Sequence, residues 1–330
     1  ILGLASVAFL VDTLYKKPLT DAFMAAITLA VSAIPEGLPA AVTIILAIGV
    51  SRMARRRAII RKLPAVETLG STTIICSDKT GTLTQNQMAV QQIIAGEARY
   101  ETTGTGYVPS GHILRVPTTT GQGAPINPSA EAALMECLKT GLLYNDSFLV
   151  EKEGRWDVHG DPTEGALIVS AYKGGLSLDK LRELLPRVDT IPFDSQHQYM
   201  ATLHVFEGKR KIVYVKGAVE VLLGKCTTSL AGSGQLVPLV KDTVQKSVEE
   251  MASGGLRVLA FARKDLPQET ASVNHADIAT GLTFLGLQGM IDPPRQEAVA
   301  AVRACQHAGM RVKMITGDHA LTAAAIAQQI

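Results

Sequence analysis

Cysteine is scarce in this chain of 330 residues, and its four copies lie far apart. Cys76, Cys137, Cys226 and Cys305 form no Cys-x-x-Cys pair. Their spacing argues against a zinc site and a disulfide framework, and it is typical of a reducing compartment. Charge is nearly absent from residues 1–50, where many of the apolar residues lie. No cleavable signal is evident, and the sequence begins inside an apolar segment without methionine, so we expect a piece of a longer chain.

Acidic residues are missing from one short segment that is rich in cations. The six cations of this segment are Arg52, Arg55, Arg56, Arg57, Arg61 and Lys62. The net charge of +2 hides this asymmetry. A nucleic-acid surface is conceivable, but no aromatic or base-reading context accompanies the cluster. Because it follows a membrane-length apolar run, we interpret it as the cytoplasmic flank of a transmembrane helix and expect no nucleic-acid partner.

Two apolar segments precede that flank. Residues 1–14 are too short to cross a bilayer of about 30 Å, and we interpret them as the end of a helix. Residues 22–50 are long enough to span the bilayer. The middle of this second segment carries Glu36, with Pro35 before it and Pro39 shortly after it.

The prolines predict a broken helix with a polar site. Each proline removes an N–H and displaces the carbonyl four residues earlier, so Pro35 would free the carbonyl of Val31 and Pro39 that of Pro35. Free carbonyls at membrane depth need a polar environment, and a carboxylate beside them suits a hard cation. Glu36 is therefore a candidate cation ligand. The alternative is a kinked helix in which Glu36 is neutral and hydrogen-bonded.

Residues 78–84 read Asp-Lys-Thr-Gly-Thr-Leu-Thr, directly after a short apolar run. The run predicts a strand that ends in Asp78, whose carboxylate can attack a phosphoryl group and carry it as an acyl phosphate. Lys79 and a divalent metal would offset the charge on the transferring oxygens. Hydroxyls and backbone N–H groups would hold the rest of the phosphate. The alternative is an ordinary strand-to-loop turn.

The strands that partner the Asp78 strand are expected near the end of the chain. Residues 282–287 predict a buried strand, residues 298–305 the apolar face of a helix, and residues 311–315 the next strand. Strand, helix and strand with loops at the carboxyl ends describe a doubly wound parallel sheet. In such a sheet Asp78 and Thr316 would lie at the same edge.

Between these parts, residues 87–291 form an insertion that is too long for a connection, and we interpret it as a separate domain. Three features in it suggest nucleotide binding. A β-branched strand ends in Lys216 and Gly217, where a lysine can reach a phosphate or a ring edge. Phe193 is able to stack on adenine, and Arg257 lies in an apolar strand and needs a partner such as a triphosphate. Each feature alone is more often structural.

Together, the Asp78 motif and the segments from Pro35-Glu36-Gly37-Leu38-Pro39 to Thr316-Gly317-Asp318 resemble the P-type ATPases of type II, cation pumps that cycle through an aspartyl phosphate. The likeness covers nearly the whole chain and is closest to the calcium-transporting kind. It implies an α/β fold: transmembrane helices, then a haloacid-dehalogenase-like phosphorylation domain with a doubly wound parallel sheet, split by an α+β nucleotide-binding insert. The implied parts are residues 1–50 (transmembrane), 51–86 (stalk and first part of the phosphorylation domain), 87–291 (nucleotide-binding domain) and 292–330 (second part of the phosphorylation domain).

The resemblance also implies ATP and Mg²⁺ as cofactors, with Mg²⁺ held at Asp78 and Thr80. The implied residues of the phosphate site are Asp78, Lys79, Thr80, Thr316, Gly317 and Asp318. The implied residues of the nucleotide site are Glu164 near the adenine amino group, Phe193, Lys216, Gly217, Arg257, and Asp292, which orders the loops near the phosphate. The implied ligands of the transported cation are Glu36 and the carbonyls of Val31, Ser32 and Ile34.

Two positions depart from the calcium-pump pattern. Gln198 stands where many of these pumps have lysine, and Ser195 where they have arginine, so the pocket keeps its apolar base but loses positive charge. Pro39 favours calcium, because sodium–potassium pumps usually lack this proline. A pump for a monovalent cation such as Na⁺ stays an alternative.

Two other classes of protein share some of these features. A soluble haloacid-dehalogenase-like phosphohydrolase would have a second aspartate two positions after the first, where this chain has Thr80, which favours a long-lived phosphoenzyme. A non-catalytic module would bind nucleotide without acid-stable label.

The pump hypothesis carries its own expectations. The partners would be the transported cation, with Ca²⁺ favoured, the lipid bilayer, and the remainder of the pump chain with its actuator domain and further transmembrane helices. The location would be a multi-pass membrane protein with both domains in the cytoplasm. The isolated piece is expected to bind nucleotide and to pump nothing.

Overall fold

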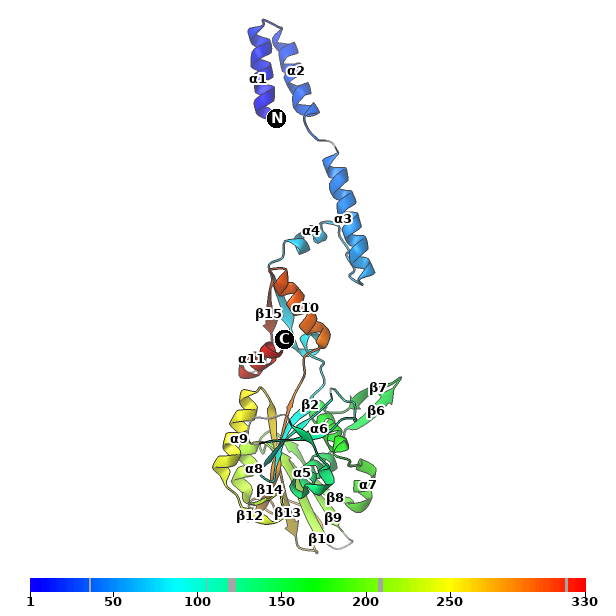
Figure 1. The fold of residues 1–330 in the computed structure, drawn as a ribbon, viewed down its shortest axis with the longest axis vertical. Helices are drawn as coiled ribbons and strands as arrows, with labels where there is room; N and C mark the ends of the chain where they lie inside the picture. Colours follow the sequence, from blue (N-terminus) through cyan, green and yellow to red (C-terminus); the bar gives the residue numbers. More distant parts are fainter. Residues whose placement is uncertain (36, 105, 118–122, 207–209, 318–319) are drawn as a thin grey trace. The chain divides into compact units, whose positions relative to one another are not determined.

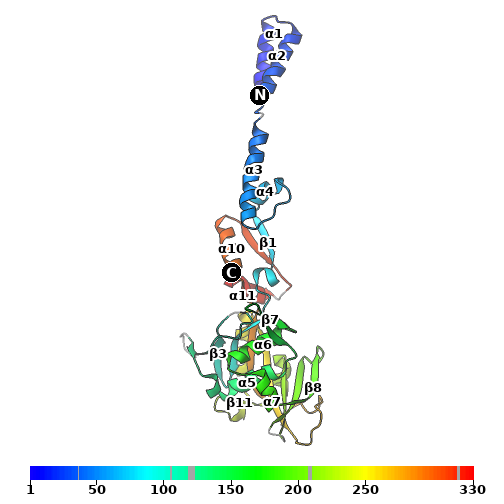
Figure 2. The ribbon, with the colours of Figure 1, turned by 90° about the vertical axis from the view of Figure 1, so that its right-hand side faces the viewer.

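A computed structural model describes residues 1–330 except 36, 105, 118–122, 207–209 and 318–319 (Figures 1 and 2). The chain divides into two units, residues 1–74 and residues 75–330.

The first unit is helical. Its elements are α1 (Leu2–Leu14), α2 (Leu19–Ser32), α3 (Leu38–Arg55) and α4 (Pro64–Gly70). Helices α1 and α2 pack together, with the small residues Ala22 and Ala26 buried and the rings of Phe9 and Phe23 edge to face. Among the described residues, α3 is the one helix long and apolar enough to cross a membrane, by length and composition, and none of it is buried; α1 and α2 are apolar but shorter.

The expected single Pro-broken helix is two separate helices, α2 and α3, and the predicted free carbonyls are not free. The carbonyl of Val31 accepts a hydrogen bond from the N–H of Ile34, and that of Pro35 from the N–H of Leu38, each at 3.0 Å. Tight turns of this kind satisfy the carbonyls that a helix end leaves unpaired. Pro39 lies in the first turn of α3, where its missing N–H has no helical partner in any case.

The second unit contains a small sheet that carries the Asp78 motif. Strand β1 (Ile74–Asp78) pairs with β15 (Arg311–Ile315). Helix α10 (Gln296–His307) precedes β15, and α11 (Ala320–Gln329) follows it. In the described part of the chain, this sheet has only these two strands, so it is smaller than the doubly wound parallel sheet that the sequence predicts.

A large mixed sheet makes up the rest of the second unit. Its main path runs in the order β5 (Ala124–Pro125), β4 (Ile113–Val116), β3 (Ala98–Thr102), β2 (Ala89–Ala95), β14 (Leu282–Ile291), β13 (Arg257–Leu266), β10 (Arg210–Gly217), β9 (Tyr199–Phe206) and β8 (Arg187–Asp194). All pairs along this path are antiparallel. Strand β11 (Cys226–Leu230) pairs in parallel with β14 and antiparallel with β12 (Leu236–Pro238). A separate hairpin joins β6 (Phe148–Lys152) and β7 (Arg155–His159).

Helices cover both faces of the large sheet (Figure 1). One core contains the apolar faces of α5 (Ala132–Leu143), α6 (Pro162–Lys173) and α7 (Leu178–Leu184). A short 3₁₀ turn at Pro128–Ala130 precedes α5. The other core contains those of α8 (Val219–Lys225) and α9 (Lys241–Ser253). Because both faces are covered, all ten residues of β14 are buried.

The predicted partnership between residues 282–287 and the Asp78 strand is wrong. These residues belong to β14, which pairs with β2, β11 and β13 in the large sheet. A continuous apolar run predicts a strand that is buried on both faces, but it does not say which sheet contains that strand.

Candidate functional site

The Asp78 motif forms a tight turn at the end of β1. Asp78 is exposed, and the chain then turns through Lys79–Leu83, where Gly81 has a φ of 71°. A residue with a Cβ is strained at this φ, so the turn requires the glycine of the motif. Lys79 is only 7% exposed. The turn therefore leaves the candidate nucleophile accessible and buries the neighbouring lysine.

The loop after this turn is tied to the segment that follows β14. The carboxylate of Asp292 accepts hydrogen bonds from the Thr84 hydroxyl at 2.5 Å and from the Gln87 N–H at 3.0 Å. Arg295 donates to the carbonyls of Thr84 at 2.8 Å and Gly81 at 3.1 Å. These contacts join residues more than 200 positions apart, so the shape of the loop depends on the chain that returns from the large sheet.

The second part of the predicted phosphate site follows β15. Thr316 and Gly317 come directly after this strand, and Asp78 is the last residue of its neighbour β1. The structure thus brings together the two strands that carry the candidate residues. Thr80 is exposed in the turn, and Asp318 lies outside the described residues.

A cavity of about 630 Å³ contains the residues predicted for nucleotide binding. They come from different elements: Glu164 from α6, Phe193 from β8, Lys216 and Gly217 from the end of β10, and Arg257 from the start of β13. The rest of the lining is Asp161, Thr163, Gln198, Met200, Ala218, Val219, Glu220, Val248, Ala252, Leu256, Val258 and Leu259. The cavity therefore combines an apolar wall with a few charged groups, as is usual for ligand sites.

Lys216 and Glu164 form a buried ion pair at this cavity, with Nζ and Oε1 3.2 Å apart and side chains 5% and 14% exposed. The ammonium also donates to the Tyr144 carbonyl at 3.0 Å and to Asn145 Oδ1 at 3.1 Å. Burial lowers the pKa of Lys216, and the Glu164 carboxylate opposes this shift. The lysine is therefore held by three acceptors, as many as its N–H groups.

The second carboxylate oxygen of Glu164 is also held in place. Oε2 accepts hydrogen bonds from the Ser147 hydroxyl at 2.8 Å and from the N–H groups of Asp146 and Ser147 at 3.2 Å each. The N-cap of α6, Asp161, accepts from the N–H groups of Thr163 and Glu164 and fixes the start of that helix. Only Oε1 of Glu164, which contacts Lys216, keeps spare capacity to accept a hydrogen bond from a ligand.

Gly217 is required by the neighbouring strand. A Cβ at this position would lie 2.5 Å from the carbonyl oxygen of Gln198 and 2.6 Å from the Cβ of Tyr199. The N–H of Ala218 also donates to the Gln198 carbonyl at 2.9 Å. Gln198 has a φ of 56° and lines the cavity. Ser195, the other position that departs from the calcium-pump pattern, is not part of the lining.

Among the predicted nucleotide-site residues that line the cavity, Phe193 and Arg257 are the exposed ones. Phe193 is 59% exposed, although an aromatic side chain is usually buried more deeply. The Arg257 guanidinium is exposed, and its Nη1 lies 3.5 Å from the Thr163 hydroxyl. Both side chains are therefore available to a ligand.

Sequence reasoning did not identify Tyr144, Asn145 and Ser147, which hold the Lys216–Glu164 pair. Asn145 lies 71 positions from Lys216 in the sequence, and no local pattern marks it. The only available signal was indirect, because a buried lysine needs several acceptors.

A second cavity of about 400 Å³ contains residues from both predicted sites. Lys79 and Asp292 line it together with Arg257, which also lines the nucleotide cavity. The remaining lining residues are Met88, Gly255, Met290, Ile291, Thr322 and Ile326. Arg257 therefore lies between two cavities: the nucleotide cavity, which contains Glu164 and Phe193, and the second cavity, which contains Lys79 of the Asp78 loop.

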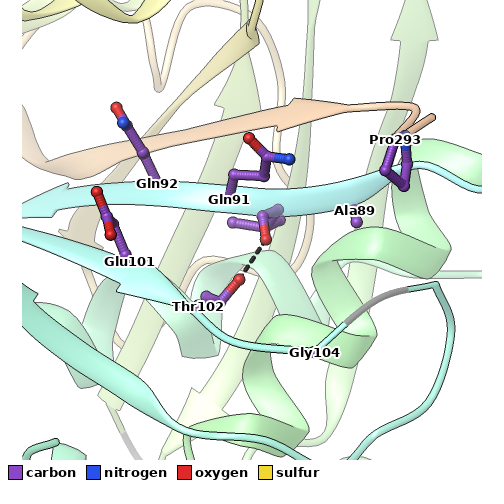
Figure 3. A pocket seen from close by; sticks show the side chains of 8 residues that line it. Ala89, Gln91, Gln92, Glu101, Thr102, Gly104 and Pro293 are labelled. Atoms are coloured by element: carbon purple, nitrogen blue, oxygen red, sulfur yellow. Dashed lines mark hydrogen bonds between the residues drawn. The ribbon is translucent and has the colours of Figure 1, made fainter. Parts of the chain in front are cut away.

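A third pocket of about 300 Å³ contains none of the predicted site residues. It lies over β2 and β3, with Gln91, Gln92 and Glu101 around it (Figure 3). The Thr102 hydroxyl donates to the Val90 carbonyl at its base. This pocket is therefore no part of the phosphate and nucleotide sites described above.

The residues predicted to bind the transported cation are not seen to converge on one site in the part of the chain that the structure describes. Glu36 lies outside the described residues. The Val31 carbonyl is used in a turn, the Ser32 hydroxyl donates to the Thr28 carbonyl at 2.7 Å, and Ile34 is exposed. Among the described residues, no group of three or more His, Cys, Asp or Glu side chains is arranged to hold a metal ion.

Comparison with known proteins identifies the family. A family model described as "P-type ATPase, cytoplasmic domain N" matches residues 133–297, half of the chain. The chain belongs to the family of P-type cation-transporting ATPases.

Individual relatives agree with this assignment. The chain is 56% identical to "Cation-transporting ATPase pma1" of Synechocystis sp. over 94% of its own length and 34% of the relative. It is 51% identical to "Probable cation-transporting ATPase F" of Mycobacterium tuberculosis, over 100% of this chain and 36% of the relative. It is 39% identical to "Calcium-transporting ATPase" of Bacillus subtilis, over 97% and 35% respectively. The chain thus spans about a third of the length of the relatives it matches.

Proposed function

We propose that this chain is the central part of an ATP-driven cation pump that forms an aspartyl phosphate on Asp78. The observation that carries the proposal is the nucleotide cavity, whose charged and aromatic residues adjoin, through Arg257, a second cavity that contains Lys79 and Asp292. In this proposal residues 87–291 form the nucleotide-binding domain. The flanking parts, 51–86 and 292–330, form a haloacid-dehalogenase-like phosphorylation domain.

ATP binds in the cavity of about 630 Å³. The adenine ring stacks on the exposed Phe193, and its amino group donates to Oε1 of Glu164, the carboxylate oxygen with spare capacity. Arg257 contacts the phosphates with its exposed guanidinium. The buried Lys216 holds Glu164 in place, which is a supporting role within the same site.

The chemical step is an in-line phosphoryl transfer. A carboxylate oxygen of Asp78 attacks the γ-phosphorus and forms a new P–O bond. The bond to the β–γ bridging oxygen breaks, and ADP leaves with that electron pair. Lys79 and Thr316 stabilise the charge on the transferring oxygens. Position 80 is threonine, so no second aspartate is available there to hydrolyse the acyl phosphate quickly, which supports a pump over a soluble phosphohydrolase.

A magnesium ion fits the donor set of the Asp78 turn. Mg²⁺ is usually held by one or two carboxylates together with phosphate oxygens and water, and Asp78 and Thr80 are exposed oxygen donors. They would hold the ion, which supplies positive charge to the phosphate oxygens when it is bound.

The membrane part of the proposal rests on α3 and on the break before it. Helix α3 crosses the bilayer, and formation of the phosphoenzyme alters access to a cation site at Glu36, Val31, Ser32 and Ile34. Calcium is the first choice of cation, supported by Pro39 and by the calcium-transporting relatives at 39% identity. A monovalent cation is the alternative.

The test is phosphoenzyme formation by the full-length protein that contains this chain. With radiolabelled ATP, we expect acid-stable label in the natural protein and none in Asp78→Asn, which should still bind ATP because Asp78 does not line the nucleotide cavity. Acid-stable label that persists in Asp78→Asn would refute the assignment of Asp78. Binding of ATP without any label in the natural protein would favour a non-catalytic module.

A further inference from the structure

The last turn of α3 and the segment that follows it carry six cations, all of them exposed: Arg52, Arg55, Arg56, Arg57, Arg61 and Lys62. Within the part of the chain that the structure describes, none of them has a hydrogen bond or an ion pair from its side chain. By contrast, the Lys17 ammonium, between α1 and α2, is paired with Asp12 at 2.8 Å. Unpaired like charges repel each other, so the cluster is unfavourable unless an anion is near it.

The turn that holds these cations is well defined. The N–H of Ala58 donates to the carbonyl of Met53 at 3.0 Å, and the N–H of Arg57 to that of Ala54 at 2.9 Å. These two bonds form a Schellman motif, in which the residue after the C-cap has a positive φ and is usually glycine. Here that residue is Arg57, with a φ of 63°.

An arginine at this position is strained, since glycine would adopt the same φ without cost. Strain of this kind persists where the side chain has another use. The attraction of cations to a helix carboxyl end accounts for Arg52 and Arg55, which lie in the last turn of α3. It does not account for Arg57 or for Arg61 in the returning segment.

The same segment exposes apolar side chains beside the charges. Ile59 is 88% exposed, and Leu63 is 42% exposed. After them, α4 returns toward α3 and contacts it (Figures 1 and 2). Cations and large apolar side chains on one short turn, at the end of an apolar helix, fit a membrane interface, where headgroups solvate the charges and acyl chains the apolar groups.

We propose that the turn at residues 52–63 is a binding site for the headgroups of anionic phospholipids. Phosphate oxygens of the lipids pair with Arg56, Arg57, Arg61 and Lys62, and Ile59 enters the boundary of the acyl chains. The inference rests on the proposed membrane position of α3, because only then does the turn lie at headgroup level.

The experiment uses the full-length protein in nanodiscs of phosphatidylcholine with a limiting fraction of phosphatidylglycerol. The readout is the association of spin-labelled phosphatidylglycerol relative to spin-labelled phosphatidylcholine at the protein boundary. We expect the protein to prefer the anionic lipid, and we expect added NaCl to reduce this preference. Removal of each arginine should lower the relative association constant of the anionic lipid about fivefold. Arg57→Gly is the decisive variant, because it removes the charge and relieves the strain at the same position. Its melting temperature should not fall, whereas Arg57→Lys should keep the preference.

A matched control removes two exposed lysines from α9, in Lys241→Gln with Lys246→Gln, and should leave the preference unchanged. Phosphoenzyme formation is measured on the same nanodiscs. If the natural protein is phosphorylated but shows no anionic preference, or if Arg57→Gly keeps the full preference, the inference is wrong and the proposed function stands. If the preference depends on Arg57 but no phosphoenzyme forms, the lipid site stands and the proposed function fails.

Discussion

Replacement of Lys216 by methionine separates a supporting lysine from a phosphate ligand. The three acceptors of its ammonium are Glu164 Oε1, Asn145 Oδ1 and the Tyr144 carbonyl. They use all three N–H groups, so none is left for a phosphate. Methionine has a similar length and fills the space of the apolar stem. The variant should therefore remove the support of Glu164 and leave the shape of the cavity nearly unchanged.

The structure sets the size of the effect. Removal of one partner from a buried ion pair costs about 3–5 kcal/mol. Glu164 is 14% exposed and keeps three hydrogen bonds to Oε2, so we expect a loss of only about 2–3 kcal/mol. This loss corresponds to a factor of about 30–150 in the equilibrium constant for unfolding. It should appear as faster hydrogen exchange of the β10 amides.

The binding assay compares adenosine, ADP and ATP on the full-length protein. If Lys216 acts only through Glu164, its replacement should weaken all three ligands by the same factor. A loss confined to ATP and ADP, with adenosine unchanged, would show that Lys216 is a phosphate ligand and refute the reasoning. Lys211→Met, on the same strand and without a side-chain partner among the described contacts, is the matched control and should change neither exchange nor affinity.

Two further predictions concern the same domain. Arg257→Gln should weaken ATP about tenfold, the lower range for a charge-assisted hydrogen bond at an exposed site, and leave adenosine unchanged; equal losses for both ligands would contradict a phosphate contact. Acid should destabilise the large sheet through His204, because burial lowers its pKa from 6.5 to about 4 while the ring bonds to the Leu185 carbonyl and to Thr202. The unfolded state takes up the proton at higher pH, so stability falls as the pH decreases from about 6.5 to 4, by about 2 kcal/mol between pH 7 and pH 5. Hydrogen exchange of the β9 amides, corrected for its intrinsic pH dependence, measures this loss, and an equal loss in His204→Gln would exclude His204 as its source.

Much of the candidate site could be anticipated from local chemistry. The strand before Asp78, the glycine at the positive φ of residue 81, and a strand that ends in Lys216 and Gly217 all follow from short patterns. The tie between Asp292 and the Asp78 loop could be expected only through the family resemblance, because its partners lie 205 and 208 positions apart. Two of the three acceptors of Lys216, the Tyr144 carbonyl and Asn145 Oδ1, were not found, since they lie 72 and 71 positions from the lysine and no local pattern marks them.

The amino-acid sequence by itself determined where most strands and helices form, which residue carries the candidate nucleophile, and that α3 is apolar up to its last turn. These properties depend on neighbouring residues and on side-chain periodicity, which a single segment contains. Tertiary structure alone decided that β14 joins the large sheet and that Arg257 lines two cavities. These outcomes depend on pairings between segments far apart in the chain, and many pairings satisfy the same local pattern until packing selects one.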